Sequence, residues 1–180
     1  MSRAIFLDRD GVLNRAIIRE GRPYPPSTIL ELHLLPGVKE VMHALSKKGW
    51  KLIVVTNQPD VARGVLSRFQ VNEINQYLIS RLPIDQMKVC FHDDSDGCLC
   101  RKPKPGMLID SARELDIDLS ESFMIGDRWR DIEAGKNAGC KTIFIDHSYS
   151  EKQPMLMDFK VSSLDEAAKI ILGKNYENDK

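Results

Sequence analysis

Polar side chains stand directly after three short apolar segments of this chain. They are Asp8 and Asp10, Thr56 and Asn57, and Asp127. If the apolar segments are neighbouring parallel strands, their carboxyl ends bring these side chains to one edge of a sheet, where ligands gather. Carboxylates that are held together repel one another, so the cluster needs a cation, and hard oxygen ligands select Mg²⁺. The spacing therefore predicts a magnesium site built from separate strand ends.

Two cationic residues, Arg101 and Lys102, could neutralise phosphate oxygens beside that cation. Carboxylates, Mg²⁺, a hydroxyl and a lysine are together the components of phosphoryl transfer. The pair of Asp8 and Asp10 is a weak signal alone, because carboxylates are common in turns. Its weight comes from the hydroxyl, the lysine and the third carboxylate that follow it along the chain. A further acid, Asp131, is expected to lie exposed or at a helix N-terminus.

A second metal site is predicted from four soft or borderline ligands within eleven positions of the chain. They are Cys90, His92, Cys98 and Cys100. Such a set can close tetrahedrally around Zn²⁺, and because the protein fills all four positions the metal would be structural. The zinc-binding loop would then fix the two cations that follow its last ligand. Cys140 stands alone and is expected to be buried.

The composition limits the kind of protein. The chain has 180 residues, of which 42% are hydrophobic and 29% are charged, as in a globular domain with a core. Lys and Arg together number 26, as do Asp and Glu, and this zero net charge argues against a nucleic-acid partner. With no long apolar run and no signal peptide, we expect a cytoplasmic protein. We also expect one domain over residues 1–174 and a polar tail over 175–180.

The elements that must position these residues alternate regularly between strands and helices. Apolar runs predict strands at residues 4–7, 51–56, 87–91, 123–125, 142–145 and 159–161. Apolar residues at helical spacing predict helices near residues 38–45, 71–78, 105–115 and 132–138. A last helix is expected to open with a capping box of Ser163 and Glu166 and to close at Gly173. This alternation predicts an α/β fold with a doubly wound, mainly parallel sheet.

One segment, residues 19–28, carries three prolines and Gly21 and is expected to be an irregular loop. It also holds Arg19 and Arg22, which belong to no motif that we can map. We expect both to be solvated, with contact to the substrate as the alternative. No insert large enough to form a mobile cap domain follows Asp10 or Thr56. We therefore expect an open site.

Four segments resemble, in order, the motifs of the haloacid dehalogenase (HAD) superfamily of phosphatases. They are Asp8-Arg-Asp10-Gly, Thr56-Asn-Gln, Lys102 and Gly126-Asp127. The resemblance covers roughly residues 5–145 and implies the Rossmann-like fold of that superfamily. It implies that Asp8 attacks phosphorus to form an aspartyl phosphate and that Asp10 is the general acid and base. It further implies that Thr56 and Lys102 stabilise the transferring group, and that Mg²⁺ is held by the side chains of Asp8 and Asp127 and the backbone carbonyl of Asp10.

Within the superfamily, residues 62–64 (Ala-Arg-Gly) and 100–107 (Cys-Arg-Lys-Pro-Lys-Pro-Gly-Met) look most like the heptose 1,7-bisphosphate phosphatases. Those enzymes remove the 7-phosphate on the path to nucleotide-activated heptose for surface polysaccharide. The resemblance implies a structural zinc in the Cys and His loop. It implies substrate contacts from Asn57, Gln58, Arg63 and Arg101. The chain departs from the pattern at Pro59-Asp60, where Ser-Gly is usual, and this departure concerns sugar specificity.

Three other functions stay open on the residues alone. Histidinol-phosphate phosphatases share the motifs and the metal loop, so they are the nearest alternative. A signalling receiver domain also has Asp, Thr and Lys at strand ends, but its acidic pair precedes the acceptor strand and no zinc loop is expected there. A polynucleotide 3′-phosphatase would need a basic track that the zero net charge disfavours. We expect a monomer that takes a small phosphorylated sugar, with neither nucleic acid nor a membrane as its partner.

Overall fold

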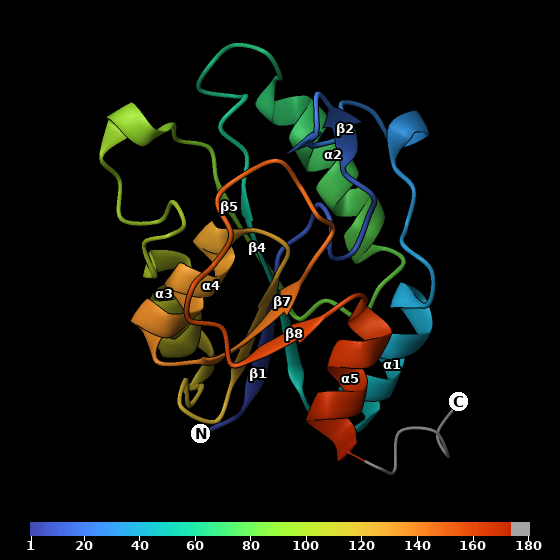
Figure 1. Cartoon of the computed structure of the whole chain (residues 1–180), viewed down its shortest axis with the longest axis vertical. Coiled ribbons are helices and arrows are strands. Elements are labelled where there is room, and N and C mark those ends of the chain that lie inside the picture. The colour runs from blue at the N-terminus through green and yellow to red at the C-terminus, as the bar shows by residue number, and fades with distance from the viewer. Residues whose placement is uncertain (174–180) are drawn as a thin grey trace.

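A six-stranded parallel sheet forms the centre of the computed structural model, which describes residues 1–173 (Figure 1). The strand order is β5-β4-β1-β6-β7-β8. The strands are β1 (Ala4–Leu7), β4 (Lys51–Asn57), β5 (Gln86–Cys90), β6 (Phe123–Gly126), β7 (Lys141–Ile145) and β8 (Phe159–Val161). This confirms the predicted sheet and all six predicted strands, with bounds shifted by a few residues. The division into one domain stays a prediction, and the tail over 175–180 lies outside the described residues.

Helices cover both faces of the sheet, so the fold is doubly wound. The helices are α1 (Val38–Lys47), α2 (Arg68–Ile79), α3 (Gly106–Leu115), α4 (Trp129–Ala138) and α5 (Leu164–Leu172). Figure 1 shows α3 and α4 on one side of the sheet and α1 and α5 on the other. Apolar residues of α1, α2 and α5 pack into one core cluster, and those of α3 and α4 pack into the other. None of the helices within residues 1–173 is long and apolar enough to cross a membrane.

Strand β1 is central because it is buried on both faces. Ile5 and Leu7 face the cluster of α1 and α5, while Ala4 and Phe6 face the cluster of α3 and α4. β1 pairs with β4 on one side and with β6 on the other. Since all three strands run in parallel, their carboxyl ends lie at one edge, as a site made from Asp8, Thr56 and Asp127 requires.

The expectation of an irregular loop over residues 19–28 is wrong. Strands β2 (Ile17–Arg19) and β3 (Arg22–Tyr24) form an antiparallel hairpin, followed by the short helix η1 (Ile29–Glu31). The two turn residues, Glu20 and Gly21, both have positive φ, which is the conformation of a two-residue hairpin turn. Arg19 and Arg22 flank this turn as a hydrogen-bonded pair, so the next pair, Ile18 and Pro23, is not hydrogen-bonded. The missing N–H of Pro23 therefore costs the hairpin nothing.

The last helix opens with half of the predicted capping box. Ser163 Oγ accepts a hydrogen bond from the backbone N–H of Glu166 at 3.2 Å. The carboxylate of Glu166 reaches one residue further back and accepts from the N–H of Ser162 at 2.7 Å. The helix ends at Gly173, as predicted.

Gly135 in α4 provides a test of how closely this helix packs on the sheet. A Cβ at Gly135 would lie 2.6 Å from Met124 Cβ and 2.8 Å from Thr142 Cγ2. Gly→Ala within a helix normally adds about 1 kcal/mol of stability. Here we expect Gly135→Ala to lose about 1–3 kcal/mol in urea unfolding, because the extra methyl overpacks the interface. The exposed neighbour Asn137→Ala is the control and should change stability by less than about 0.5 kcal/mol.

Candidate active site and metal sites

A cavity of about 220 Å³ lies at the carboxyl ends of β1, β4 and β6. Its lining contains five aspartates, namely Asp8, Asp10, Asp60, Asp127 and Asp131. The β2–β3 hairpin contributes Arg22 and Tyr24 to the same lining. The cavity thus brings the predicted strand-end carboxylates together under a small hairpin.

Lys102 is the buried cation of this cavity, with 1% of its surface exposed. Its Nζ lies 2.9 Å from Asp8 Oδ1 and 2.7 Å from Asp131 Oδ1, and it donates a third bond to the carbonyl of Val55 at 2.7 Å. Burial disfavours the ammonium, but the charges of Asp131 and Asp8 outweigh this effect and raise the pKa of Lys102. The side chain is therefore a fixed positive charge beside Asp8.

Asn57 holds the backbone that carries this lysine. Its side-chain amide donates to the carbonyl of Lys102 at 3.0 Å and accepts from the N–H of Lys102 at 3.1 Å. The paired bonds fix the loop that follows Cys100 against the end of β4. Asn57 also lines the cavity, so its side chain is in a position to contact a bound substrate.

Asp10 is held by donors from three other residues. Arg9 is fully buried and donates to Asp10 through Nε at 3.2 Å and Nη2 at 2.9 Å. Asn14 and Gln58 donate to the same carboxylate through their amides, each at 2.9 Å. Gln58 also donates to Thr56 Oγ1 at 2.9 Å. Gln58 and Thr56 are both buried, and Gln58 links Thr56 to Asp10.

The carboxylate of Asp127 is buried without a partner. Neither of its oxygens accepts a hydrogen bond of good geometry from the described residues, although the Tyr149 hydroxyl lies nearby. Burial, followed by the charges of Asp8 and Asp131, raises the pKa of Asp127 well above its ordinary value. Burial and the charge of Asp131 likewise raise the pKa of Asp8 to about 6, against the attraction of Lys102. Burying a carboxylate with no hydrogen bond is costly unless a cation is bound.

The donor set fits a hard divalent cation. Carboxylate oxygens of Asp8, Asp127 and Asp131 all lie within 4.8 Å of one another. Asp131 is already engaged, because one oxygen contacts Lys102 and the other accepts from the N–H of Arg128 at 3.0 Å. Asp8 and Asp127 are therefore the candidate side-chain ligands, and their role stays a prediction.

Close backbone approach brings these groups together. Gly11 has a φ of +83°, and a Cβ there would lie 1.8 Å from Asp127 Oδ2. A Cβ at Gly126 would lie 2.1 Å from Asp131 Cβ. Any side chain at either position would therefore displace one of the cavity carboxylates.

Asp131 lies in the cavity, although the sequence did not predict it to be a site residue. It does stand in the first turn of α4, as one of the two predicted alternatives has it, but it is buried at 1% exposure. Its position four residues after Asp127 was the available signal, because a strand end and the first turn of the next helix face the same edge of the sheet. The exposed alternative is excluded by its contact with Lys102.

The predicted substrate-binding arginines take different positions. Arg63 lines the cavity and donates to Asp93 through Nε at 2.8 Å and Nη2 at 2.7 Å. Arg101 does not line it. Its guanidinium donates to Asp94 at 2.8 Å and to the carbonyl of His92 at 3.2 Å, within the Cys and His loop.

Arg130 lines the cavity and was missed from the sequence. It donates to the two oxygens of Asp94 at 3.1 and 3.2 Å. Asp94 thus joins Arg130 at the cavity to Arg101 in the Cys and His loop. The position of Arg130 depends on this loop, which no local pattern around Arg130 indicates.

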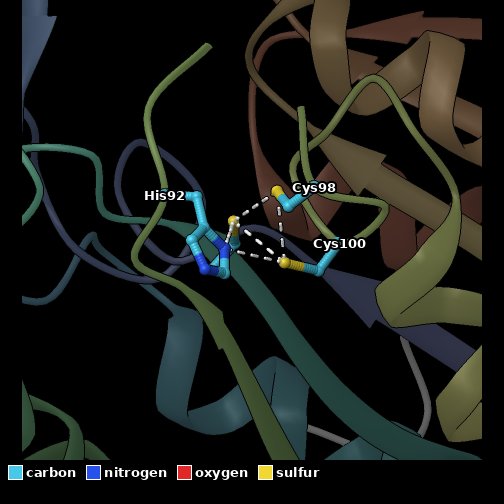
Figure 2. Close-up of side chains that lie close together, drawn as sticks. His92, Cys98 and Cys100 are labelled. Carbon is cyan, nitrogen blue, oxygen red and sulfur yellow. Dashed lines mark hydrogen bonds between the residues drawn. The ribbon is translucent and has the colours of Figure 1, made fainter. Parts of the chain in front are cut away.

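The four predicted zinc ligands converge in the structure (Figure 2). Cys90 Sγ lies 3.7 Å from Cys98 Sγ and 3.2 Å from Cys100 Sγ, and the last two sulfurs are 3.5 Å apart. His92 Nδ1 lies 3.6 Å from Cys90 Sγ and 3.4 Å from Cys100 Sγ. In a tetrahedral site with Zn–S bonds of about 2.3 Å, neighbouring sulfurs are about 3.8 Å apart. The cluster therefore has the size of a tetrahedral metal site. Cys140 is buried and lies outside it, as expected.

Comparisons with known proteins agree with this geometry. A relative from Pasteurella multocida named D-glycero-beta-D-manno-heptose-1,7-bisphosphate 7-phosphatase is 38% identical over 152 residues, which cover 78% of this chain and 79% of the relative. A relative of the same name from Photorhabdus laumondii is 38% identical over 143 residues, or 73% of each chain. A solved D,D-heptose 1.7-bisphosphate phosphatase from B. bronchiseptica, complexed with magnesium and phosphate, superimposes with a TM-score of 0.77 and 29% identity, over 94% of this chain and 98% of that one.

The family assignment rests on a match over more than half of the chain. The model of the haloacid dehalogenase-like hydrolase family matches residues 26–139, which contain Thr56, Lys102 and Asp127. Asp8 and Asp10 precede the matched region but share the cavity with these residues. The chain belongs to the haloacid dehalogenase-like hydrolases.

Proposed function

We propose that this protein is a Mg²⁺-dependent phosphatase that removes the 7-phosphate from D-glycero-D-manno-heptose 1,7-bisphosphate, in the synthesis of nucleotide-activated heptose. The observation that carries the proposal is the contact of Asp8 with the buried ammonium of Lys102, beside a buried Asp127 carboxylate that accepts no hydrogen bond of good geometry from the described residues. This is an arrangement for attack on a phosphate rather than for a structural ion pair. The names of the relatives support the sugar.

Asp8 is the nucleophile in this proposal. Its oxygen attacks phosphorus in line, the bond to the sugar oxygen breaks, and an aspartyl phosphate forms on Asp8. The ammonium of Lys102, held 2.9 Å from the same carboxylate, stabilises the negative charge of the transferring group. Water then hydrolyses the aspartyl phosphate and regenerates Asp8.

Asp10 is the general acid and base. It lines the cavity two residues after the nucleophile, and the donors from Arg9, Asn14 and Gln58 fix its orientation. It gives a proton to the leaving sugar oxygen and later takes one from the attacking water. Thr56 stabilises the transferring group together with Lys102, and its hydroxyl accepts a hydrogen bond from Gln58 at 2.9 Å.

Mg²⁺ would be held by the side chains of Asp8 and Asp127 and by the backbone carbonyl of Asp10. When bound, it would neutralise charge on the phosphoryl oxygens and on the clustered carboxylates. The Cys and His loop would hold a structural Zn²⁺ at Cys90, His92, Cys98 and Cys100. That ion would fix Asp93 and Asp94, which in turn hold the arginines at the cavity.

Substrate contacts from Asn57, Gln58, Arg63 and Arg101 stay predictions, as do the monomeric state and the cytoplasmic location. The resemblance implies Ser-Gly at the positions where this chain has Pro59 and Asp60, and both of these residues line the cavity. The decisive measurement is kcat/KM for both anomers of the heptose bisphosphate and for histidinol phosphate. A higher value for histidinol phosphate would overturn the sugar assignment and leave the phosphatase chemistry intact.

The first prediction concerns the nucleophile. Asp8→Asn should reduce turnover by more than about 10³-fold, because a neutral amide cannot attack phosphorus. Asp10→Asn should also be slow, but Asp8 in that variant can still be trapped by beryllofluoride. The check is phosphate release together with mass spectrometry of the trapped species. An Asp8→Asn protein within about tenfold of wild type would remove Asp8 from this role.

The second prediction concerns stability in a chelator. The pKa of Asp8 in the fold is raised from 3.8 to about 6. Ionised Asp8 therefore lowers the free energy of unfolding of the metal-free protein. This loss of stability is complete above pH 6 and shrinks as the pH falls toward 3.8. Asp8→Asn should therefore raise the Tm of the metal-free protein by a few degrees at pH 7.5, with a gain that shrinks toward pH 4. Asp118→Asn is the control and should change the Tm in the opposite direction, because hydrogen bonds from Ser120 lower the pKa of Asp118. A lower Tm for Asp8→Asn at pH 7.5 would contradict the prediction.

The third prediction concerns zinc. The purified protein should contain about one zinc ion per chain by atomic absorption, and Cys98→Ser should lose most of it because only three ligands remain. Hydrogen exchange should then rise in residues 91–101 while the sheet stays protected. Cys140→Ala is the control and should keep its zinc, since Cys140 lies outside the cluster. A fully active, well-protected protein without zinc would rule out the structural role.

A further inference from the structure

The cations that line the cavity differ in whether the protein already neutralises them. Four of them have ion pairs with carboxylates: Lys102 with Asp8 and Asp131, Arg63 with Asp93, Arg128 with Glu151, and Arg130 with Asp94. The fifth is Arg22 on β3. Within residues 1–173 the Arg22 side chain has no ion pair and no hydrogen bond. Arg22 is exposed, and no carboxylate of the described residues neutralises it before an anion enters the cavity.

Arg22 is held over the cavity by a docked hairpin. The carbonyl of Gly21, at the turn, accepts a hydrogen bond from the N–H of Ser150 at 2.9 Å, so the hairpin tip is tied to the loop between β7 and β8. A Cβ at Gly21 would lie 2.6 Å from Ser150 Oγ, which shows how closely the two loops meet. Pro23 follows Arg22 directly and restricts the backbone there. The guanidinium therefore extends from a fixed point rather than from a free loop.

A second cation faces Arg22 across the hairpin. Arg19 is its direct partner in the β2–β3 register, and like charges in opposite positions destabilise a strand pair. Arg19 is turned onto the ring of Tyr24, with its guanidinium carbon 5.5 Å from the ring centroid. Arg22 has no such ring contact. An anion at Arg22 would offset the repulsion that the hairpin otherwise carries.

We propose that Arg22 is a specificity-determining residue that binds the second, non-transferring phosphate of a bisphosphorylated substrate. This rests on the proposed function, which places the reacting phosphate at Asp8 and Lys102. The second phosphate of the same sugar must then bind another cation. Among the cations that line the cavity, Arg22 is the one with no ion pair to a carboxylate of the described residues. Its planar guanidinium can donate two hydrogen bonds to phosphate oxygens.

The test compares substrates that share the reacting phosphate but differ in the second one. Steady-state kinetics would be measured with the heptose 1,7-bisphosphate, the heptose 7-phosphate and para-nitrophenyl phosphate. Arg22→Ala should raise KM for the bisphosphate by about tenfold to a hundredfold with kcat little changed, because one charge-assisted contact is lost. KM for the two monophosphates should change by less than about threefold. Arg22→Lys should recover part of the loss.

Arg19→Ala is the matched control. It removes the same charge from the same hairpin, at the position opposite Arg22, but Arg19 is not part of the cavity lining. We expect it to leave the ratio of kcat/KM for bisphosphate over monophosphate within about threefold of wild type. Circular dichroism of both variants would show that the fold is intact.

The outcomes separate this proposal from the proposed function. The same four proteins would also be assayed with fructose bisphosphate and its monophosphate. If the wild type has a higher kcat/KM for fructose bisphosphate than for the heptose bisphosphate, and Arg22→Ala lowers the ratio of kcat/KM for bisphosphate over monophosphate, the heptose assignment fails and the role of Arg22 stands. If the wild type has the higher kcat/KM for the heptose bisphosphate and Arg22→Ala leaves its bisphosphate-to-monophosphate ratio unchanged, only the role of Arg22 fails. The role of Arg22 would also be overturned if Arg22→Ala lowered kcat/KM equally for mono- and bisphosphates, or if the wild type showed no preference for bisphosphates over monophosphates.

Discussion

The site depends on one buried ammonium among three buried carboxylates. Lys102 contacts Asp8 and Asp131, while Asp127 beside them has no hydrogen bond from the described residues. If all four groups are ionised, two negative charges are in excess in a region shielded from water, where charge interactions are strong. The raised pKa of Asp8 and of Asp127 reflects this excess. A fold that collects acids in this way has a built-in affinity for a divalent cation.

The Cys and His loop extends this electrostatic arrangement to the mouth of the cavity. It supplies Asp93 and Asp94, and these two carboxylates hold Arg63, Arg101 and Arg130. Long arginine side chains lose considerable rotamer entropy when they are fixed, so a rigid anchor lowers the cost at the moment of binding. A loop that contributes no reacting group can in this way determine how well the cavity is organised.

Much of the fold could be predicted from the sequence, because β1 and β4 are apolar runs buried on both faces and the helices have regular apolar spacing. The gathering of Asp8, Asp10 and Asp127 followed from the same rule for parallel strand ends. The hairpin escaped prediction, since Pro23 argues against a strand unless the hydrogen-bonding pattern of its partner is known. Asp131 and Arg130 were not predicted as site residues, for a related reason. Whether a charged helix residue is buried or paired depends on residues far away in the chain, here Lys102 and Asp94.

The order of strands in the sheet has a consequence for the chain during its synthesis. β1 is made first, yet one of its two neighbours, β6, comes after more than a hundred further residues. Until β6 and α4 have left the ribosome, β1 can pair only with β4, and Asp8 lacks the backbone carbonyl of Ile125 that its N–H donates to at 3.0 Å. Contacts of such long sequence separation form late in folding. A nascent chain therefore carries Asp8 for most of its translation without the strand end and the helix that place Asp127 and Asp131 beside it.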